Sequence, residues 1–128
     1  MTVIVNFIDG GRGVEILASD IVYGHEVIAA NREIAHSTQL ADLKFHIIDK
    51  SNCTEYKVSS SELFEISKYD SIFMQYNPGI VMAIIESRAL RFSLSILWQC
   101  IVEKQNLKNK SFSDRPSALK WIEKQLSN

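Results

Sequence analysis

The chain contains few of the residues that hold small domains together by covalent bonds or metal ions. Its 128 residues include only two cysteines, Cys53 and Cys100. Their separation fits neither a CxxC motif nor a disulfide framework. Both thiols are therefore expected to be reduced, as in a cytoplasmic protein. Two prolines and five glycines give no sign of a linker or a low-complexity tract.

A strong charge of either sign is also lacking. The formal net charge is -1, with 14 basic and 15 acidic residues spread along the chain. Without a basic stripe nothing can neutralise a run of phosphates, so neither nucleic acid nor an anionic membrane surface is expected as a partner. No apolar run approaches the roughly 20 residues that span a bilayer, and the first residues lack the pattern of a secretory signal. A soluble, cytoplasmic protein is predicted.

Groups that carry chemistry are sparse as well. His25, His36 and His46 have no ligand spacing among themselves or with acids and cysteines, so no metal site is predicted. Each histidine is expected at the surface or half-buried. No nucleophile elbow or activated cysteine is present, and neither a catalytic residue nor a cofactor is predicted. Asp49 follows a predicted strand at the end where ligands of open sheets bind. It is either a ligand-binding carboxylate or a cap of the following turn.

Strand and helix patterns alternate regularly along the chain. Two β-rich runs around Gly10, Gly11 and Gly13 predict an antiparallel hairpin whose turn needs positive φ. The order that follows predicts a single α/β domain over residues 1–128, with a mixed, mostly parallel sheet and about four helices. The further expected elements are helices over 24–42, 60–76, 88–104 and 115–126 and strands over 43–52, 80–87 and 109–114, the last an edge strand.

Three consecutive serines precede the helix expected from residue 60. Ser59 as N-cap and Glu62 three residues later form the pattern of a capping box, and Val58 with Leu63 that of a hydrophobic staple. A helix start also offers free N–H groups and a positive dipole end, which favour a phosphate on Ser60 or Ser61. The two interpretations, a cap alone or a cap with a regulatory phosphorylation site, both remain open.

The helix expected over 88–104 has two apolar stripes. One stripe is assigned to the core because its residues recur at helical spacing. The other is either buried by the last helix or exposed as a contact surface for a partner, a second copy or an acyl chain. The core stripe comprises Leu90, Leu94, Leu97 and Ile101, and the second stripe comprises Phe92, Ile96 and Cys100.

Several stretches occur together in the order and spacing of a known family. The chain resembles the STAS-fold proteins described as SpoIIAA-like, a branch grouped with the lipid-binding CRAL-TRIO domains, from about residue 14 to residue 126. The stretches are HEVIAANREI at 25–34, LKFHIIDKSNCTEYKVSSSEL at 43–63, AIIES at 83–87 and FSDRPSALKWI at 112–122.

The resemblance implies a bacterial signalling module that acts by binding and not by catalysis. In the anti-sigma-factor antagonists of this family, a partner kinase phosphorylates a serine at the start of the second helix. Asp49 matches the aspartate that ends the preceding strand there, and Ser59 or Ser60 falls near the phosphorylated position. Lys57 and Glu62 stand where that context has an acid and a glycine.

Two functions from different classes follow from the sequence. The first is a regulatory module that binds a protein partner, such as a signalling kinase, and that forms homodimers. The second is a carrier of a small apolar ligand, as the CRAL-TRIO relation implies. Candidate ligand or partner residues are Asp49, Phe92, Ile96 and Trp98, and the expected cavity for an apolar ligand is lined by Phe73, Met74, Phe92 and Trp98.

Overall fold

The computed structural model describes residues 2–87, 90, 101 and 106–127. One five-stranded sheet has the order β1-β2-β3-β4-β5, in which β1 is antiparallel to β2 and all other neighbours are parallel. The strands are β1 (Val3–Ile8), β2 (Gly13–Tyr23), β3 (Phe45–Lys57), β4 (Val81–Ile85) and β5 (Lys108–Phe112), and the described helices are α1 (Gly24–Ala35), α2 (Ser60–Tyr76) and α4 (Arg115–Leu126).

The α/β class, the mostly parallel sheet and the N-terminal antiparallel hairpin are thus confirmed. The predicted bounds of α2 and α4 are confirmed to the residue, and β5 is an edge strand as expected. The helix expected over 88–104 lies outside the described residues, apart from Leu90 and Ile101. Its two apolar stripes are therefore not described, and neither are the candidate residues Phe92, Ile96 and Trp98.

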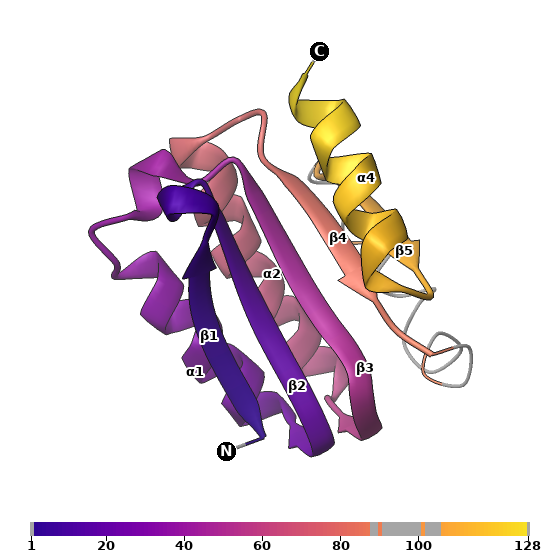
Figure 1. Ribbon diagram of the computed structural model, residues 1–128. Helices are drawn as coiled ribbons and strands as arrows, with labels where there is room; N and C mark the ends of the chain where they lie inside the picture. The colour runs from indigo at the N-terminus through magenta and orange to yellow at the C-terminus, as the bar shows by residue number, and fades with distance from the viewer. Residues whose placement is uncertain (1, 88–89, 91–100, 102–105, 128) are drawn as a thin grey trace.

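Helices lie on both faces of the sheet. Figure 1 shows α1 and α2 behind the strands and α4 in front of β4 and β5. Because the parallel strands follow one another in a single direction, right-handed crossovers place α1 and α2 on the same face. We call this the α1/α2 face and the opposite one the α4 face. Within the described part of the chain, no helix lies in front of β1 and β2 on the α4 face (Figure 1).

Alternation along the strands gives each face its own apolar cluster. Fully buried β-branched and large side chains dominate both clusters, as expected for strands covered by helices. On the α1/α2 face the cluster includes Val14, Ile16, Ile34, Ile48, Phe73 and Met82. On the α4 face it includes Phe45, Ile47, Val81, Ala83, Ile85, Ala118 and Ile122.

The hairpin turn is a short 3-10 helix, η1 (Asp9–Gly11). Gly10 has a φ of 63° and Gly11 a φ of 90°, so the need for positive φ is confirmed at these two positions. Gly13 is different, because the aromatic ring of Phe45 lies 2.1 Å from the place where its Cβ would be. Glycine is needed there for close approach and not for turn geometry.

The first helix is shorter than predicted. The pattern predicts a helix over 24–42, but α1 ends at Ala35, and a separate 3-10 helix, η2 (Leu40–Asp42), follows. The hydroxyl of Ser37 accepts a hydrogen bond of 3.0 Å from the backbone N–H of Gln39. Such a local bond offers the backbone an alternative to the helix and ends α1 early. Conversely, β3 continues to Lys57, beyond the predicted end at residue 52.

Gly13→Ala is expected to destabilise the protein by about 1–3 kcal/mol, because the added methyl group displaces the buried Phe45 ring. Gly79→Ala is the matched control, since nothing lies within 4 Å of its Cβ position. Urea unfolding of both variants measures the difference. Equal stability of the two variants would contradict the packing of Phe45 on Gly13.

Candidate functional site

The starts of α1 and α2 lie side by side at one edge of the sheet. Strand β2 runs directly into α1, and β3 leads through Val58 into α2. The parallel register pairs Tyr23 with Lys57, the last residues of the two strands. Both helix N-termini therefore meet at the carboxyl ends of neighbouring parallel strands.

The serine run starts α2 as the sequence predicts. Ser59 is the N-cap, and its hydroxyl accepts a hydrogen bond of 3.2 Å from the backbone N–H of Glu62. The Glu62 carboxylate in turn accepts one of 3.0 Å from the Ser59 N–H, which completes the capping box. Val58 and Leu63 are both buried in one apolar cluster, as the hydrophobic staple requires. Ser60 and Ser61 are exposed, with the Ser61 hydroxyl 3.2 Å from that of Ser59.

The start of α1 is capped in a similar way. Glu26 accepts a hydrogen bond of 3.0 Å from the backbone N–H of Tyr23 and another from the hydroxyl of Thr2. The hydroxyl of Thr2, followed by the Tyr23 N–H, lowers the pKa of Glu26 below its ordinary value. At the neighbouring helix, the backbone N–H of Ser59 lowers the pKa of Glu62. Each positive helix end thus already holds a carboxylate of the protein itself.

One exposed aromatic side chain lies near each of these two starts, Tyr23 before α1 and Phe64 in α2. Tyr23 stacks on His25 with ring centroids 5.9 Å apart, and the Lys57 ammonium lies 5.7 Å from the Tyr23 ring centroid. Tyr23 is 43% exposed and Phe64, in the second turn of α2, is 51% exposed. Tyr23, His25, Ser59, Ser60 and Phe64 together form what we call the helix-start surface.

Asp49 lies elsewhere, on the α4 face of the sheet. One of its carboxylate oxygens accepts hydrogen bonds from the Ser51 N–H at 3.0 Å and the Ser51 hydroxyl at 2.5 Å. This is the local bond expected of a cap, but the expected turn does not follow, because β3 continues to Lys57. The other oxygen lies 3.1 Å from Arg115, the first residue of α4. Arg115 also forms an ion pair with the buried Glu15 of β2. Arg115 thereby attaches α4 to two strands, an interaction that no local sequence pattern indicates.

A second ion pair is buried just beyond the end of the β3–β4 pairing at Asp49 and Ile85. The Lys50 ammonium lies 3.5 Å from the carboxylate of Glu86 and 3.9 Å from the ring centroid of Tyr56. Burial lowers the pKa of Lys50 and raises that of Tyr56. Because the lysine keeps an acidic and an aromatic partner, the arrangement is that of a structural cluster and not of a free base.

Two buried titratable groups line a small cavity under α2. The prediction that His46 is exposed or half-buried is wrong, because its ring is only 1% exposed. Its position in β3 places the His46 side chain on the α1/α2 face. There it packs edge-on against the Phe73 ring, with the ring centroids 5.8 Å apart. His46 and Asp70 both border a cavity of about 10 Å³, roughly the size of one water molecule. Neither side chain has a hydrogen-bond partner within the described residues.

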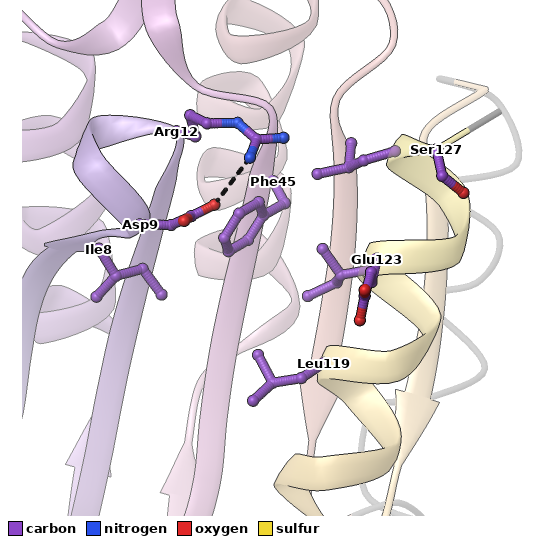
Figure 2. Close-up of a pocket in the computed structure, with 9 residues that line it drawn as sticks. Ile8, Asp9, Arg12, Phe45, Leu119, Glu123 and Ser127 are labelled. Carbon is purple, nitrogen blue, oxygen red and sulfur yellow. Dashed lines mark hydrogen bonds and ion pairs between the residues drawn. The ribbon is translucent and has the colours of Figure 1, made fainter.

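A larger groove lies at the opposite, amino-terminal ends of the parallel strands. Its volume is about 530 Å³, and it separates η1 from α4. Figure 2 shows Leu119 reaching from α4 toward the strands, with the Phe45 ring at the floor and the Asp9–Arg12 ion pair at the rim. Of the expected cavity residues, Phe73 and Met74 do not line it, because Phe73 is core and Met74 packs against the core. Phe92 and Trp98 lie outside the described residues. The groove is lined by Ile8, Asp9, Arg12, Phe45, Leu119, Ile122, Glu123, Leu126 and Ser127.

The described residues contain neither a metal-binding cluster nor a helix that could span a membrane. Within residues 2–87, 90, 101 and 106–127, no cluster of three or more histidine, cysteine or acidic side chains has the arrangement of a metal site. The helices of this described part are too short or too polar to cross a bilayer. No protein-family model matches the chain, and no curated protein matches it significantly.

The buried Asp70 makes stability depend on pH in a defined direction. Burial raises the pKa of Asp70 to about 8 from an ordinary 3.8, so its stabilising protonated form is lost as the pH rises toward 8. Burial lowers the pKa of His46 to about 4 from 6.5, so its contribution is lost only as the pH falls below 6.5. The two effects oppose each other between 4 and 6.5, and only Asp70 acts above 6.5.

The free energy of unfolding is therefore expected to fall by on the order of 2 kcal/mol between pH 6.5 and 8. Asp70→Asn should remove this fall, because the amide does not ionise. Glu65→Gln changes an exposed acid of the same helix and should keep the wild-type slope. Urea unfolding across this pH range measures all three proteins. An unchanged slope in Asp70→Asn would contradict the assignment.

Proposed function

We propose that the protein is a non-catalytic regulatory module that binds a protein partner through the helix-start surface. The observation that carries this proposal is an exposed aromatic side chain near each of the two adjacent helix starts, Tyr23 before α1 and Phe64 in the second turn of the serine-capped α2. Exposed aromatic residues next to polar groups that can be satisfied at an interface are typical of protein contact surfaces. The resemblance to SpoIIAA-like proteins supports the same kind of function.

The electrostatics of the two helix starts favour a protein over a small anion. A free phosphate or carboxylate binds helix N-termini through their unpaired N–H groups. Here Glu26 and Glu62 already accept hydrogen bonds at these ends, and their charges repel a second anion. A protein partner can instead bury Tyr23 and Phe64 without displacing either carboxylate.

Phosphorylation of Ser60 is the regulatory step within this proposal. Its hydroxyl is exposed in the first turn of α2, where a kinase has access and where the carboxylate of Glu62 already compensates the helix dipole. Glu62 lies two residues away, so the added charge changes the potential of the whole surface. Ser59 serves as the cap, because its hydroxyl is already bound to the Glu62 N–H.

Tyr23→Ala and Phe64→Ala are expected to weaken partner binding at least about tenfold, because each removes an exposed anchor of the surface. The measurement is quantitative recovery of partners from native extracts by the tagged full chain, with thermal unfolding measured in parallel. Neither change should alter stability by more than about 0.5 kcal/mol.

Tyr76→Ala is the matched control, since Tyr76 is the last residue of the same helix and is 59% exposed. It should leave binding unchanged, while Ser60→Asp should weaken binding without loss of stability. Partner recovery that is equal in Tyr23→Ala, Phe64→Ala and Tyr76→Ala would overturn the proposed surface.

The groove between η1 and α4 favours a second candidate function, the binding of a small apolar ligand. Its volume of about 530 Å³ lies within the usual range of about 300–1,000 Å³ for ligand sites. Ile8, Phe45, Leu119 and Ile122 contribute an apolar lining, and the charges of Asp9 and Arg12 stay at the rim. This arrangement suits an acyl or aromatic ligand with a polar end.

Leu119→Glu is expected to lower the affinity for the neutral fluorescent probe phenylnaphthylamine at least about tenfold, because it brings a charge into the groove. Ile21→Glu changes a similarly exposed residue far from the groove and serves as the control. Fluorescence titration measures both variants. Equal probe binding by the wild type and both variants would exclude the groove as the binding site.

A further inference from the structure

The two edges of the sheet differ in the protection they carry against pairing with another strand. The β5 edge has two lysines, Lys108 and Lys110, which natural sheets use to discourage edge-to-edge contact. The β1 edge has the sequence VIVNFI, without a charged residue, proline or glycine. None of its six side chains is fully buried, and Ile4 is 43% exposed.

Hydrogen-bond geometry shows which backbone groups of β1 face outward. The Thr2 carbonyl accepts a hydrogen bond of 2.8 Å from the Ser19 N–H, in register with the pairing of β1 and β2. In an antiparallel ladder the residues alternate in direction, and both backbone groups of one residue point to the same side. Ile4 and Asn6 therefore bond to β2, whereas Val3, Val5 and Phe7 direct their N–H and C=O groups to the open edge.

We propose that a second copy of this chain pairs with this edge, β1 against β1, about a two-fold axis through Val5. An antiparallel strand pair about such an axis joins the α1/α2 face of one copy to the α1/α2 face of the other. Odd-numbered residues of β1 can therefore lie opposite only odd-numbered residues of the second copy. The outward-facing set then pairs with itself: Val5 with Val5 of the second copy, and Val3 with Phe7. Each such pair exchanges two backbone hydrogen bonds. The two sheets join into one continuous sheet.

The side chains favour the same register. Val3, Val5 and Phe7 pack against the cluster of the α1/α2 face but are only partly buried, because nothing in the described part of the chain continues the sheet beyond β1. In the dimer these three side chains meet their counterparts across the new strand pair, an aromatic–aliphatic contact of the kind that stabilises sheets. No like charges oppose each other along β1, whereas a β5–β5 pair would bring lysines together.

The size of the contact sets the expected strength of the dimer. A six-residue strand is roughly 20 Å long, so the strand pair covers much less than the about 800 Å² per partner of a standard stable interface. The dimer is therefore concentration-dependent and not obligate. It leaves the helix-start surface free, since Tyr23 lies beyond the end of the β1–β2 pairing. The dimer does not depend on the proposed function of that surface.

Sedimentation velocity of the full chain over roughly 1–300 µM tests the proposal, and a monomer–dimer equilibrium is expected. Ile4→Lys should raise the dissociation constant at least about tenfold, because it gives β1 the protection that β5 already has. Ile21→Lys changes a residue of similar exposure on the same face but away from the β1 edge. It should leave the equilibrium unchanged.

Oxidative cross-linking tests the register. Opposed residues of a hydrogen-bonded pair are about 5.5 Å apart at Cα, within the about 4.4–6.8 Å that a disulfide spans. Val5→Cys should therefore give a disulfide that joins the two copies at this position, identified by peptide mass, and Ile21→Cys should give none. Three results would each overturn the proposal. The first is a monomer at all concentrations. The second is a dimer that Ile4→Lys does not weaken and that Val5→Cys does not cross-link, and the third is a monomeric Val5→Cys chain that cross-links at this position to a different protein.

Discussion

The parallel pairing of β2 with β3 is the constraint on which the rest of the structure depends. The pairing continues to Tyr23 and Lys57, whereas β4 pairs only with the first residues of β3, up to Asp49. The pairing continues through two register shifts, next to Ser19 and at Asp20, and Asp20 adopts a φ of 58° there. Because the two strands end in register, the helices that follow them begin side by side.

This placement brings two positive helix ends together, which would repel each other without compensation. The carboxylates of Glu26 and Glu62 supply the compensating negative charge. The Glu62 carboxylate also lies against Gly24, where an added Cβ would come within 2.3 Å of it. The two starts therefore form one packed unit, in which both carboxylates accept hydrogen bonds from the protein's own backbone. What remains available on this unit is the exposed aromatic surface and the Ser60 hydroxyl, which is why a protein contact with a serine switch suits it better than a bound anion.

Local patterns predicted most of the fold, and contacts between distant residues explain what they missed. The capping box at Ser59 and the bounds of α2 follow from residues adjacent in the chain. The burial of His46 follows from which face of β3 the helices cover, and the Arg115–Asp49 ion pair joins residues 66 positions apart. Neither leaves a local signal. The end of α1 at Ala35 depended on a single hydroxyl, that of Ser37, which competes with an otherwise helical pattern.

The central claim, that the helix-start surface is where a partner binds, is tested most directly by photo-cross-linking in the native cells. A photoreactive benzoylphenylalanine replaces either Phe64 or Tyr76, which lie at opposite ends of α2 and are both more than half exposed. The account predicts a cross-link to one defined protein from position 64 and none from position 76. The same cross-linked protein from both positions, or a cross-link from position 76 alone, would contradict it.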